Sequence, residues 1–253
     1  MRRQLQLVAC AVQFLTRVPM PAQAGFEPGW ITRSARYFPL VGQGVGAISA
    51  AAWLAGLQVW PPALAALVAV GLGILVTGAF HEDGLADTAD GLGGGRTPER
   101  RLEIMKDSRV GTYGVLALGL VVALRVAALT SLSPGFGAVA LVAGHGAARA
   151  TAVMAMRATP YAGDRDAAKW TPSPAPPGFA DFAVAGLIAV WPFAFMPPAA
   201  TVAGLGPALV AAWLTMLLAR RLVGGHTGDV LGAVEQVFEA TFLVGLAAVF
   251  RPG

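Results

Sequence analysis

The sequence predicts an all-α, polytopic integral membrane protein: a bundle of about seven transmembrane helices preceded by an N-terminal interfacial helix. Three observations support this fold class. Apolar residues make up 56% of the 253-residue chain, charged residues only 13%, and the mean hydropathy is +0.64, whereas a soluble domain is about a quarter charged. Several apolar stretches reach the roughly 20 residues that cross a bilayer. The charged residues gather between these stretches rather than within them.

The first 24 residues combine a basic start with a short apolar stretch, a pattern that signal peptides also show. Gln6, Gln13 and Arg17 interrupt the apolar stretch. We therefore expect residues 4–18 to form a retained amphipathic helix at the membrane interface. Arg17 is then either a headgroup anchor or a contact to a substrate phosphate.

The predicted spans cover residues 38–58, 63–80, 113–131, 136–156, 182–200, 203–221 and 234–250. Glycines in the first span permit close helix packing, and Pro192 is expected to kink the fifth. The chain shows no internal repeat and no separate domain, so residues 1–253 are expected to form a single membrane-embedded catalytic domain.

Several ionisable residues fall inside the spans, where an unpaired charge is costly and function is the default expectation. We expect Arg125 to pair with acids or carbonyls inside the bundle. For Arg149, the sequence favours neither such pairing nor a functional role over the other. His145 is expected to be a hydrogen-bonded packing residue rather than a ligand.

The basic residues predict the orientation of the chain. Fifteen of the 18 lie on one side of the membrane if the N-terminus is cytoplasmic, as the positive-inside rule requires. Membrane orientation thus explains the net charge of +4 better than a nucleic-acid partner, and none is expected. The lone Cys10 excludes an internal disulfide. The polar segments 80–114, 157–181 and 224–229 all fall on the cytoplasmic side.

The segment 80–114 is the most informative part of the chain, because it holds half of the 14 acidic residues. They are Glu82, Asp83, Asp87, Asp90, Glu99, Glu103 and Asp107. The first three aspartates recur at i, i+4 and i+7, and the last three acids at i, i+4 and i+8, so each set is expected on one helical face. Between them, Gly91–Gly95 predicts a helix stop and Thr97-Pro98 a helix start.

We expect the first set of acids near the C-terminal end of a helix that continues the second span, where the helix dipole is already negative. Such a cluster needs a counter-charge, and Mg²⁺, which prefers oxygen ligands, would supply it. Lys106 and Arg109 lie nearby and suit phosphate oxygens. This combination favours metal-assisted phosphoryl transfer over a solvated acidic turn held by salt bridges.

Two other polar segments are less specific. The glycines of Gly224–Asp229 allow backbone N–H groups to converge on an anion, with Asp229 as a further carboxylate; the alternative is a plain glycine turn. Five prolines after Thr159 exclude a regular helix through residues 157–181. Composition alone favours a proline-rich linker there, whereas the family resemblance described next favours a loop that covers the substrate.

The segments 80–92 and 103–114 together resemble the signature of the cobalamin synthase family, the adenosylcobinamide-GDP ribazoletransferases. The similarity extends to Thr16–Pro19 and Gly224–Ala233, and so spans nearly the whole chain. The resemblance implies a Mg²⁺-dependent enzyme of the cytoplasmic (inner) membrane, with its active site facing the cytoplasm. It would join adenosylcobinamide-GDP to α-ribazole or α-ribazole 5′-phosphate and release GMP, late in adenosylcobalamin assembly.

This interpretation divides the candidate site residues into three groups. The metal ligands are Asp83, Asp87, Asp90, Glu103 and Asp229. The residues that bind substrate or phosphate are Arg17, Lys106, Arg109, Lys169, Gly225, Thr227 and Gly228. The catalytic residues are His81, Asp87, Asp90 and Asp107, and the general base is either His81 or one of the carboxylates.

Two rival functions stay open at this stage. Asp87-x-x-Asp90-Gly91 resembles the start of the CDP-alcohol phosphotransferase motif of phospholipid synthesis, although the expected Ala-Arg is missing after the glycine. A cation transporter should place acids in the middle of the membrane, whereas this cluster lies at the end of a span. No Walker motif is present. The partners expected are the two substrates and the lipid bilayer, and a homo-oligomer is left open.

Overall fold

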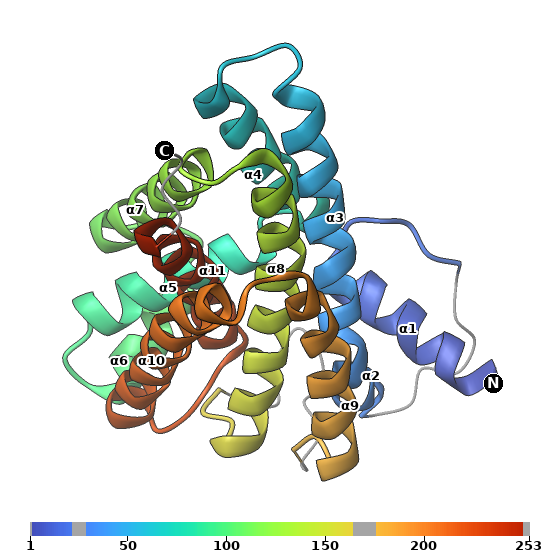
Figure 1. The fold of residues 1–253 in the computed structure, drawn as a ribbon. Helices are drawn as coiled ribbons and strands as arrows, with labels where there is room; N and C mark the ends of the chain where they lie inside the picture. Colours follow the sequence, from blue (N-terminus) through green and yellow to red (C-terminus); the bar gives the residue numbers. More distant parts are fainter. Residues whose placement is uncertain (1, 22–28, 164–175, 250–253) are drawn as a thin grey trace.

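The computed structural model describes residues 2–21, 29–163 and 176–249, which form helices joined by turns, with one isolated bridge between Tyr161 and His226. Lys169 lies outside the described residues. In chain order the elements are α1 (Arg2–Leu15), α2 (Trp30–Ser34), the 3-10 helix η1 (Ala35–Tyr37), α3 (Phe38–Gly56), α4 (Pro62–Thr77), α5 (Phe80–Gly94), α6 (Pro98–Met105), α7 (Thr112–Thr130), α8 (Pro134–Ala158), α9 (Phe179–Val190), the 3-10 helix η2 (Trp191–Phe195), α10 (Pro198–Val223) and α11 (Gly228–Val249) (Figure 1).

The predicted all-α membrane bundle is confirmed. Within the described ranges, five helical stretches are long and apolar enough to cross a membrane, and the bent pair α4–α5 raises this number to six if it counts as one span. The five are Trp30–Gly56, α7, α8, α10 and α11. The predicted span 182–200 corresponds to the shorter apolar segment Phe179–Phe195, in which α9 gives way to η2 next to Pro192.

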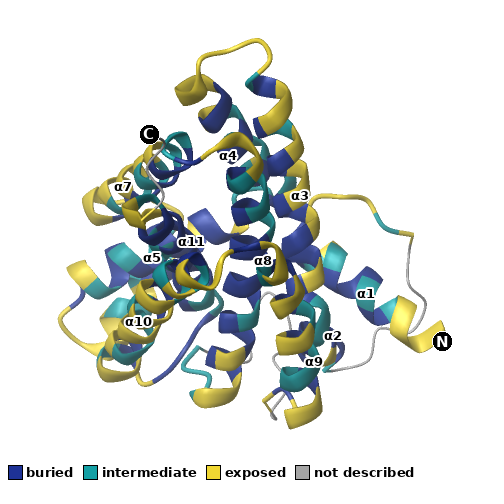
Figure 2. Cartoon of the chain, in the orientation of Figure 1, coloured by how far each residue is buried: buried dark blue, intermediate teal, exposed yellow. Residues whose placement is uncertain are grey.

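Helices α8 and α11 form the centre of the bundle (Figure 2). Of the apolar window in each helix, 78% is buried in α8 and 67% in α11, against 28% in α7 and α10. The glycine-rich start of α3 packs directly on α8, because a Cβ at Gly42 or Gly46 would meet the carbonyl oxygen of His145 or Leu141 at 2.5–2.6 Å. The close packing predicted from these glycines is confirmed.

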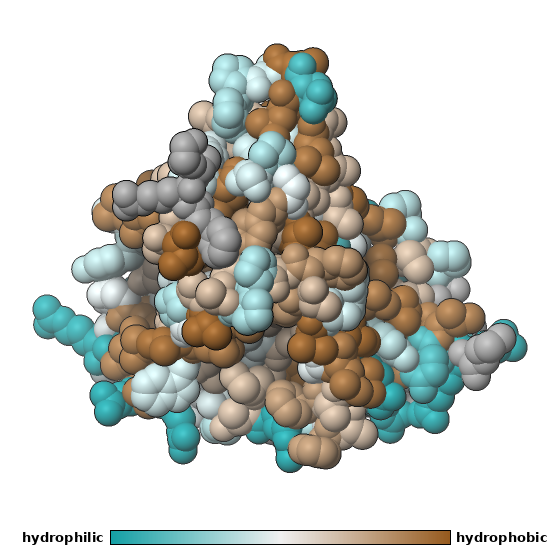
Figure 3. Space-filling view, in the orientation of Figure 1, coloured by the Kyte–Doolittle hydropathy of each residue, from teal (hydrophilic) through white to brown (hydrophobic). Residues whose placement is uncertain are grey.

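The outer surface suits lipid contact. Large apolar side chains on α7, α9 and α10 are exposed, among them Leu116, Leu187 and Trp213. Figure 3 shows hydrophobic residues across the middle of one face and hydrophilic residues gathered along its lower edge. The amphipathic helix expected at the N-terminus is present as α1, which buries Leu7, Cys10 and Leu15 against its neighbours.

The predicted continuation of the second span into the acidic segment is wrong. Gly78 and Ala79 adopt left-handed backbone conformations, with φ of 66° and 57°, and α5 leaves α4 at an angle of 90°. Asp83 therefore lies in the first turn of a new helix, near the positive end of its dipole rather than the negative end. The helix stop predicted within Gly91–Gly95 is confirmed, since α5 ends at Gly94 and Gly95 follows it as the C-cap.

Candidate active site

The acidic helix α5 crosses α11 in direct backbone contact. A Cβ at Gly84 would lie 2.8 Å from the carbonyl oxygen of Asp229, and one at Gly232 would lie 3.0 Å from the carbonyl oxygen of His81. Only glycine at both positions allows this approach. The crossing brings together two candidate segments that are far apart in the sequence, the acidic segment and the Gly224–Asp229 turn.

Three candidate carboxylates surround this crossing. Asp83 precedes Gly84 and is exposed, Asp87 lies one turn later on α5, and Asp229 lies in the first turn of α11; the last two are half-buried. Residues three apart on a helix share a face, so Asp87 lies on the same side of α5 as Gly84. Carboxylate oxygens are the donors that Mg²⁺ prefers, and this donor set fits that ion chemically. Within the described residues, no group of three or more His, Cys, Asp and Glu side chains is arranged as a preformed metal site.

Asp90 contacts the start of α7. Its two carboxylate oxygens accept hydrogen bonds from the backbone N–H groups of Gly111, at 2.7 Å, and Gly114, at 2.9 Å. A Cβ at either glycine would crowd the carboxylate. Asp90 thus satisfies two backbone donors that the first turn of α7 leaves unpaired. This close contact explains why Gly111 and Gly114 carry no side chain.

The second set of acids is more exposed. Thr97 caps α6 as predicted, accepting a hydrogen bond from the N–H of Arg100, and Glu103 forms a salt bridge of 2.8 Å with Arg100. The shared helical face predicted for this set is wrong for Asp107, because α6 ends at Met105. Asp107 instead pairs with Arg109 at 2.6 Å.

This pairing with Arg109 lowers the pKa of the Asp107 carboxyl to about 2, mainly through a hydrogen bond between the two side chains. The neighbouring Lys106 is exposed at the C-terminal end of α6. Two of the cations predicted to bind phosphate, Lys106 and Arg109, therefore lie in the connection between α6 and α7, two helices that both contact α5.

Arg17 lies against the bend that precedes α5. Its backbone N–H donates to the carbonyl of Val76 at 2.8 Å, and a Cβ at Gly78 would meet the aliphatic stem of Arg17 at 2.7 Å. The residue itself is exposed. The structure thus places this predicted phosphate contact at the start of the acidic helix.

The Gly224–Asp229 turn also ends α10 and caps α11. Gly224, with φ of 90°, ends α10, and Gly225 packs so closely on Pro160 that a Cβ would overlap its carbonyl oxygen. The hydroxyl oxygen of Thr227 accepts from the N–H of Val230 at 3.2 Å and caps α11. Gly228 is the first residue of α11.

Comparison with known proteins assigns the chain to a family. The model of the family described as cobalamin-5-phosphate synthase matches residues 7–247. The chain belongs to this family. Proteins named adenosylcobinamide-GDP ribazoletransferase are similar to it over nearly their full length: that of Leptothrix cholodnii is 43% identical, covering 98% of this chain and 97% of the relative, and that of Ralstonia pickettii is 42% identical with the same coverage. The relative from Vibrio cholerae is 39% identical, with 99% and 97% covered. No solved structure matches the chain.

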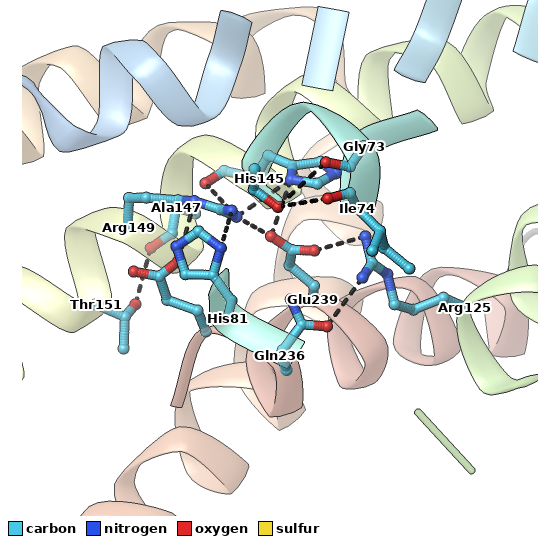
Figure 4. Close-up of polar contacts among 12 residues, drawn as sticks. Gly73, Ile74, His81, Arg125, His145, Ala147, Arg149, Thr151, Gln236 and Glu239 are labelled. Atoms are coloured by element: carbon cyan, nitrogen blue, oxygen red, sulfur yellow. Dashed lines mark hydrogen bonds and ion pairs between the residues drawn. The ribbon is translucent and has the colours of Figure 1, made fainter. Parts of the chain in front are cut away.

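This member of the cobalamin-5-phosphate synthase family also contains a buried ionic network next to the site (Figure 4). Four helices contribute to it: α5, α7, α8 and α11. The members are His81, Glu82, Arg125, His145, Arg149, Glu235, Gln236 and Glu239, all buried. Acids therefore do lie within the bundle, but they are paired with arginines there.

Arg125 is held by α11, as the expected pairing with acids requires. Its guanidinium lies 2.8 Å from a carboxylate oxygen of Glu239, 2.9 Å from the side-chain oxygen of Gln236 and 3.6 Å from Glu82. Nδ1 of His145 lies 3.1 Å from Nη1 of Arg149, at hydrogen-bond distance, and 2.9 Å from Glu239, which agrees with the expected hydrogen-bonded packing histidine.

Arg149 connects α8 to both other helices of the crossing. It pairs with Glu235, at 3.0 Å from Nε, and with Glu239, and its Nη2 lies 3.3 Å from Nδ1 of His81. Two features of the sequence point to this network: Arg125 and Arg149 fall inside predicted spans, and Glu235 and Glu239 lie four residues apart at the start of another span. No sequence feature points to Glu82 as a member.

Proposed function

We propose that the chain is an adenosylcobinamide-GDP ribazoletransferase. It would join adenosylcobinamide-GDP to α-ribazole or α-ribazole 5′-phosphate, giving adenosylcobalamin or its 5′-phosphate and GMP. The relatives' shared name, at about 40% identity over whole chains, supports the reaction. The single structural observation that supports the site is the Gly84–Asp229 contact, which gathers carboxylates beside exposed cations. The matches give no support to a CDP-alcohol phosphotransferase or a cation transporter.

The reaction breaks one P–O bond and forms another. A hydroxyl of α-ribazole attacks the phosphorus attached to cobinamide, the bond to the bridging oxygen breaks, and GMP leaves with that oxygen. Such transfers depend on in-line positioning and charge neutralisation more than on covalent help. Mg²⁺ would neutralise charge on the diphosphate when bound.

In this proposal Asp83, Asp87 and Asp229 would hold Mg²⁺. Asp90 fixes the start of α7 while keeping the remaining lone pairs of its oxygens for the ion, and Glu103 is a more distant ligand. Arg17, Lys106 and Arg109 would bind the phosphate oxygens from the bend and from the α6–α7 connection. The proton of the attacking hydroxyl passes to a carboxylate of the site.

The proposal also places the protein in the cytoplasmic (inner) membrane with the site facing the cytoplasm. The support is the distribution of basic residues, because positive charge is retained on the cytoplasmic side. The α5–α6 region, the Gly224–Asp229 turn and the basic connection between α6 and α7 then share one aqueous face.

The test is GMP release by the purified protein from adenosylcobinamide-GDP and α-ribazole. We expect turnover with Mg²⁺ and none after EDTA treatment. Asp87→Asn should lower kcat/KM by more than about 100-fold, since groups that merely support a metal ligand already cost 10–100-fold. Glu99→Gln, which changes an exposed acid of α6, is the matched control and should stay close to the unaltered enzyme. Full turnover in metal-free buffer contradicts the metal assignment, and CMP release from a CDP-alcohol contradicts the function.

A further inference from the structure

The bend between α4 and α5 stores backbone strain. Ala79 is the only residue other than glycine with a positive φ in the described part of the chain. A left-handed conformation is unfavourable for a residue with a Cβ, and such conformations persist only where the surrounding structure holds them. The contacts of the residues next to Ala79 therefore determine where α5 points.

His81, two residues after Ala79, is fixed by a closed ring of three polar contacts. Its Nε2 lies 2.9 Å from Oε2 of Glu235, and its Nδ1 lies 3.3 Å from Nη2 of Arg149. Nε of Arg149 lies 3.0 Å from the same oxygen of Glu235. The ring joins α5, α11 and α8 (Figure 4), and His81 is only 2% exposed.

These contacts define the tautomer of His81. A guanidinium can only donate hydrogen bonds, so Nδ1 of His81 must accept from Arg149. The proton of the neutral ring then sits on Nε2, which lies 2.9 Å from Oε2 of Glu235. The only lone pair of the neutral ring is on Nδ1 and faces Arg149, so His81 has none left for the proton of a substrate hydroxyl.

The ring of contacts controls the position of the acids on α5. Asp83 and Asp87 follow His81 by two and six residues on one rigid helix, within about 9 Å along its axis at 1.5 Å per residue. At Gly84 the helix touches the backbone of Asp229. A small displacement of His81 is thus a displacement of both acids relative to Asp229.

We propose that His81, Glu235 and Arg149 form a positioning triad, which holds α5 across α11 so that the acids of the two helices share one site. His81 then acts through the geometry of the carboxylates and not as the general base. The role in turnover rests on the proposed function, whereas the role in placing α5 rests on the contacts alone.

Two substitutions at one position separate these roles. His81→Gln keeps a donor that can reach Glu235, whereas His81→Leu removes every polar contact. If the triad positions α5, kcat of His81→Gln should stay within about tenfold of the original, while His81→Leu should lose 100-fold or more. A general base contributes about 10²–10⁴-fold, so loss of 100-fold or more in His81→Gln overturns the proposal, whether or not His81→Leu folds.

A distance measurement supplies a readout independent of turnover. Spin labels at Gly94→Cys on α5 and Val244→Cys on α11, in a Cys10→Ser background, report the placement of α5 by pulsed electron paramagnetic resonance. We expect the His81→Leu distance distribution to shift or broaden, and the His81→Gln distribution to match the original. An unchanged distribution in an inactive, folded His81→Leu protein overturns the proposal.

The control is Asp181→Asn, which breaks the ion pair between Asp181 and Arg36 away from α5. It should lower stability without moving the labels. The spin-label result does not depend on the substrate, so it distinguishes failure of this inference from failure of the proposed function: if the enzyme releases no GMP at all, the positional result still stands.

Discussion

At the residue scale, His226 shows how the fold controls a protonation state. The residue is 6% exposed, and its Nδ1 lies 2.9 Å from the hydroxyl oxygen of Thr159. That hydroxyl already donates to the carbonyl of Ala155 at 3.0 Å, so it accepts from His226. Burial lowers the pKa of His226 from 6.5 to about 4, and the ring is neutral at physiological pH.

This shift predicts acid sensitivity. Because the pKa is lower in the folded state, the unfolded chain binds the proton more readily between pH 6.5 and 4, and stability falls as the pH falls through this window. The loss should reach on the order of 3 kcal/mol near pH 4. In thermal unfolding of the detergent-solubilised protein, His226→Gln should flatten this part of the pH profile; an unchanged slope would show that other groups cause it.

At the scale of elements, the site depends on how two helices cross. Gly84 and Gly232 have no turn to form, and their function is to let α5 and α11 touch through their backbones. The α5 helix can reach the backbone of Asp229 at Gly84 only because the chain bends at Gly78 and Ala79. The geometry of the site is thus set by the bend and the crossing together.

Gly84→Ala should separate the two helices. The added Cβ would lie 2.8 Å from a backbone oxygen, which cannot rotate away, and overpacking of this kind costs about 1–3 kcal/mol. We expect GMP release to fall by more than about tenfold and the melting temperature to drop. Gly71→Ala is the matched control, because its Cβ meets nothing within 4 Å and alanine favours a helix. Equal activities of the two variants would exclude the crossing from the site.

The local features of the site could be predicted from the sequence, and the long-range ones could not. The spacing of Asp83 and Asp87 and the start of α6 at Thr97 depend on neighbouring residues, and patterns of four residues reveal them. Gly78 is a residue type that commonly ends a helix in the left-handed conformation, but nothing indicates that Ala79 also adopts it, because alanine favours a helix. This is why the second span and the acidic helix were expected to be continuous.

The buried network could be predicted only in part from the sequence. The cost of an unpaired charge in a membrane predicts that Arg125 has a partner, and the structure confirms it. Physical reasoning about one residue does not name that partner, because Glu239 lies far away in the sequence. Whether a glycine breaks a helix or lets two helices touch is likewise decided by the opposing segment, as at Gly91, which packs on α6.

At the scale of the whole molecule, the charge distribution predicts the orientation. In a Cys10→Ser background, we expect Ser108→Cys and Arg221→Cys to face the cytoplasm, and Gln58→Cys and Ser133→Cys to face the opposite side. All four positions are exposed. An impermeant thiol reagent added to intact cells should label only the second pair, and the first pair should react after lysis. Labelling of Ser108→Cys from outside intact cells would contradict the predicted orientation.

The buried network also constrains how the chain is inserted during synthesis. A charged side chain at the centre of a span costs about 2.5–3.5 kcal/mol when a helix enters the bilayer alone. The carboxylates closest to the arginines of α7 and α8 lie on α11, which leaves the ribosome after both helices, whereas Glu82 of α5 lies farther from Arg125, at 3.6 Å. Until α11 enters with its two acids, Arg149 lacks both carboxylates that pair with it and Arg125 lacks its closest one. These three helices therefore cannot settle independently: α11 completes the packing of α7 and α8, and a chain truncated before Gly228 would leave Arg149 in lipid without its two carboxylate partners.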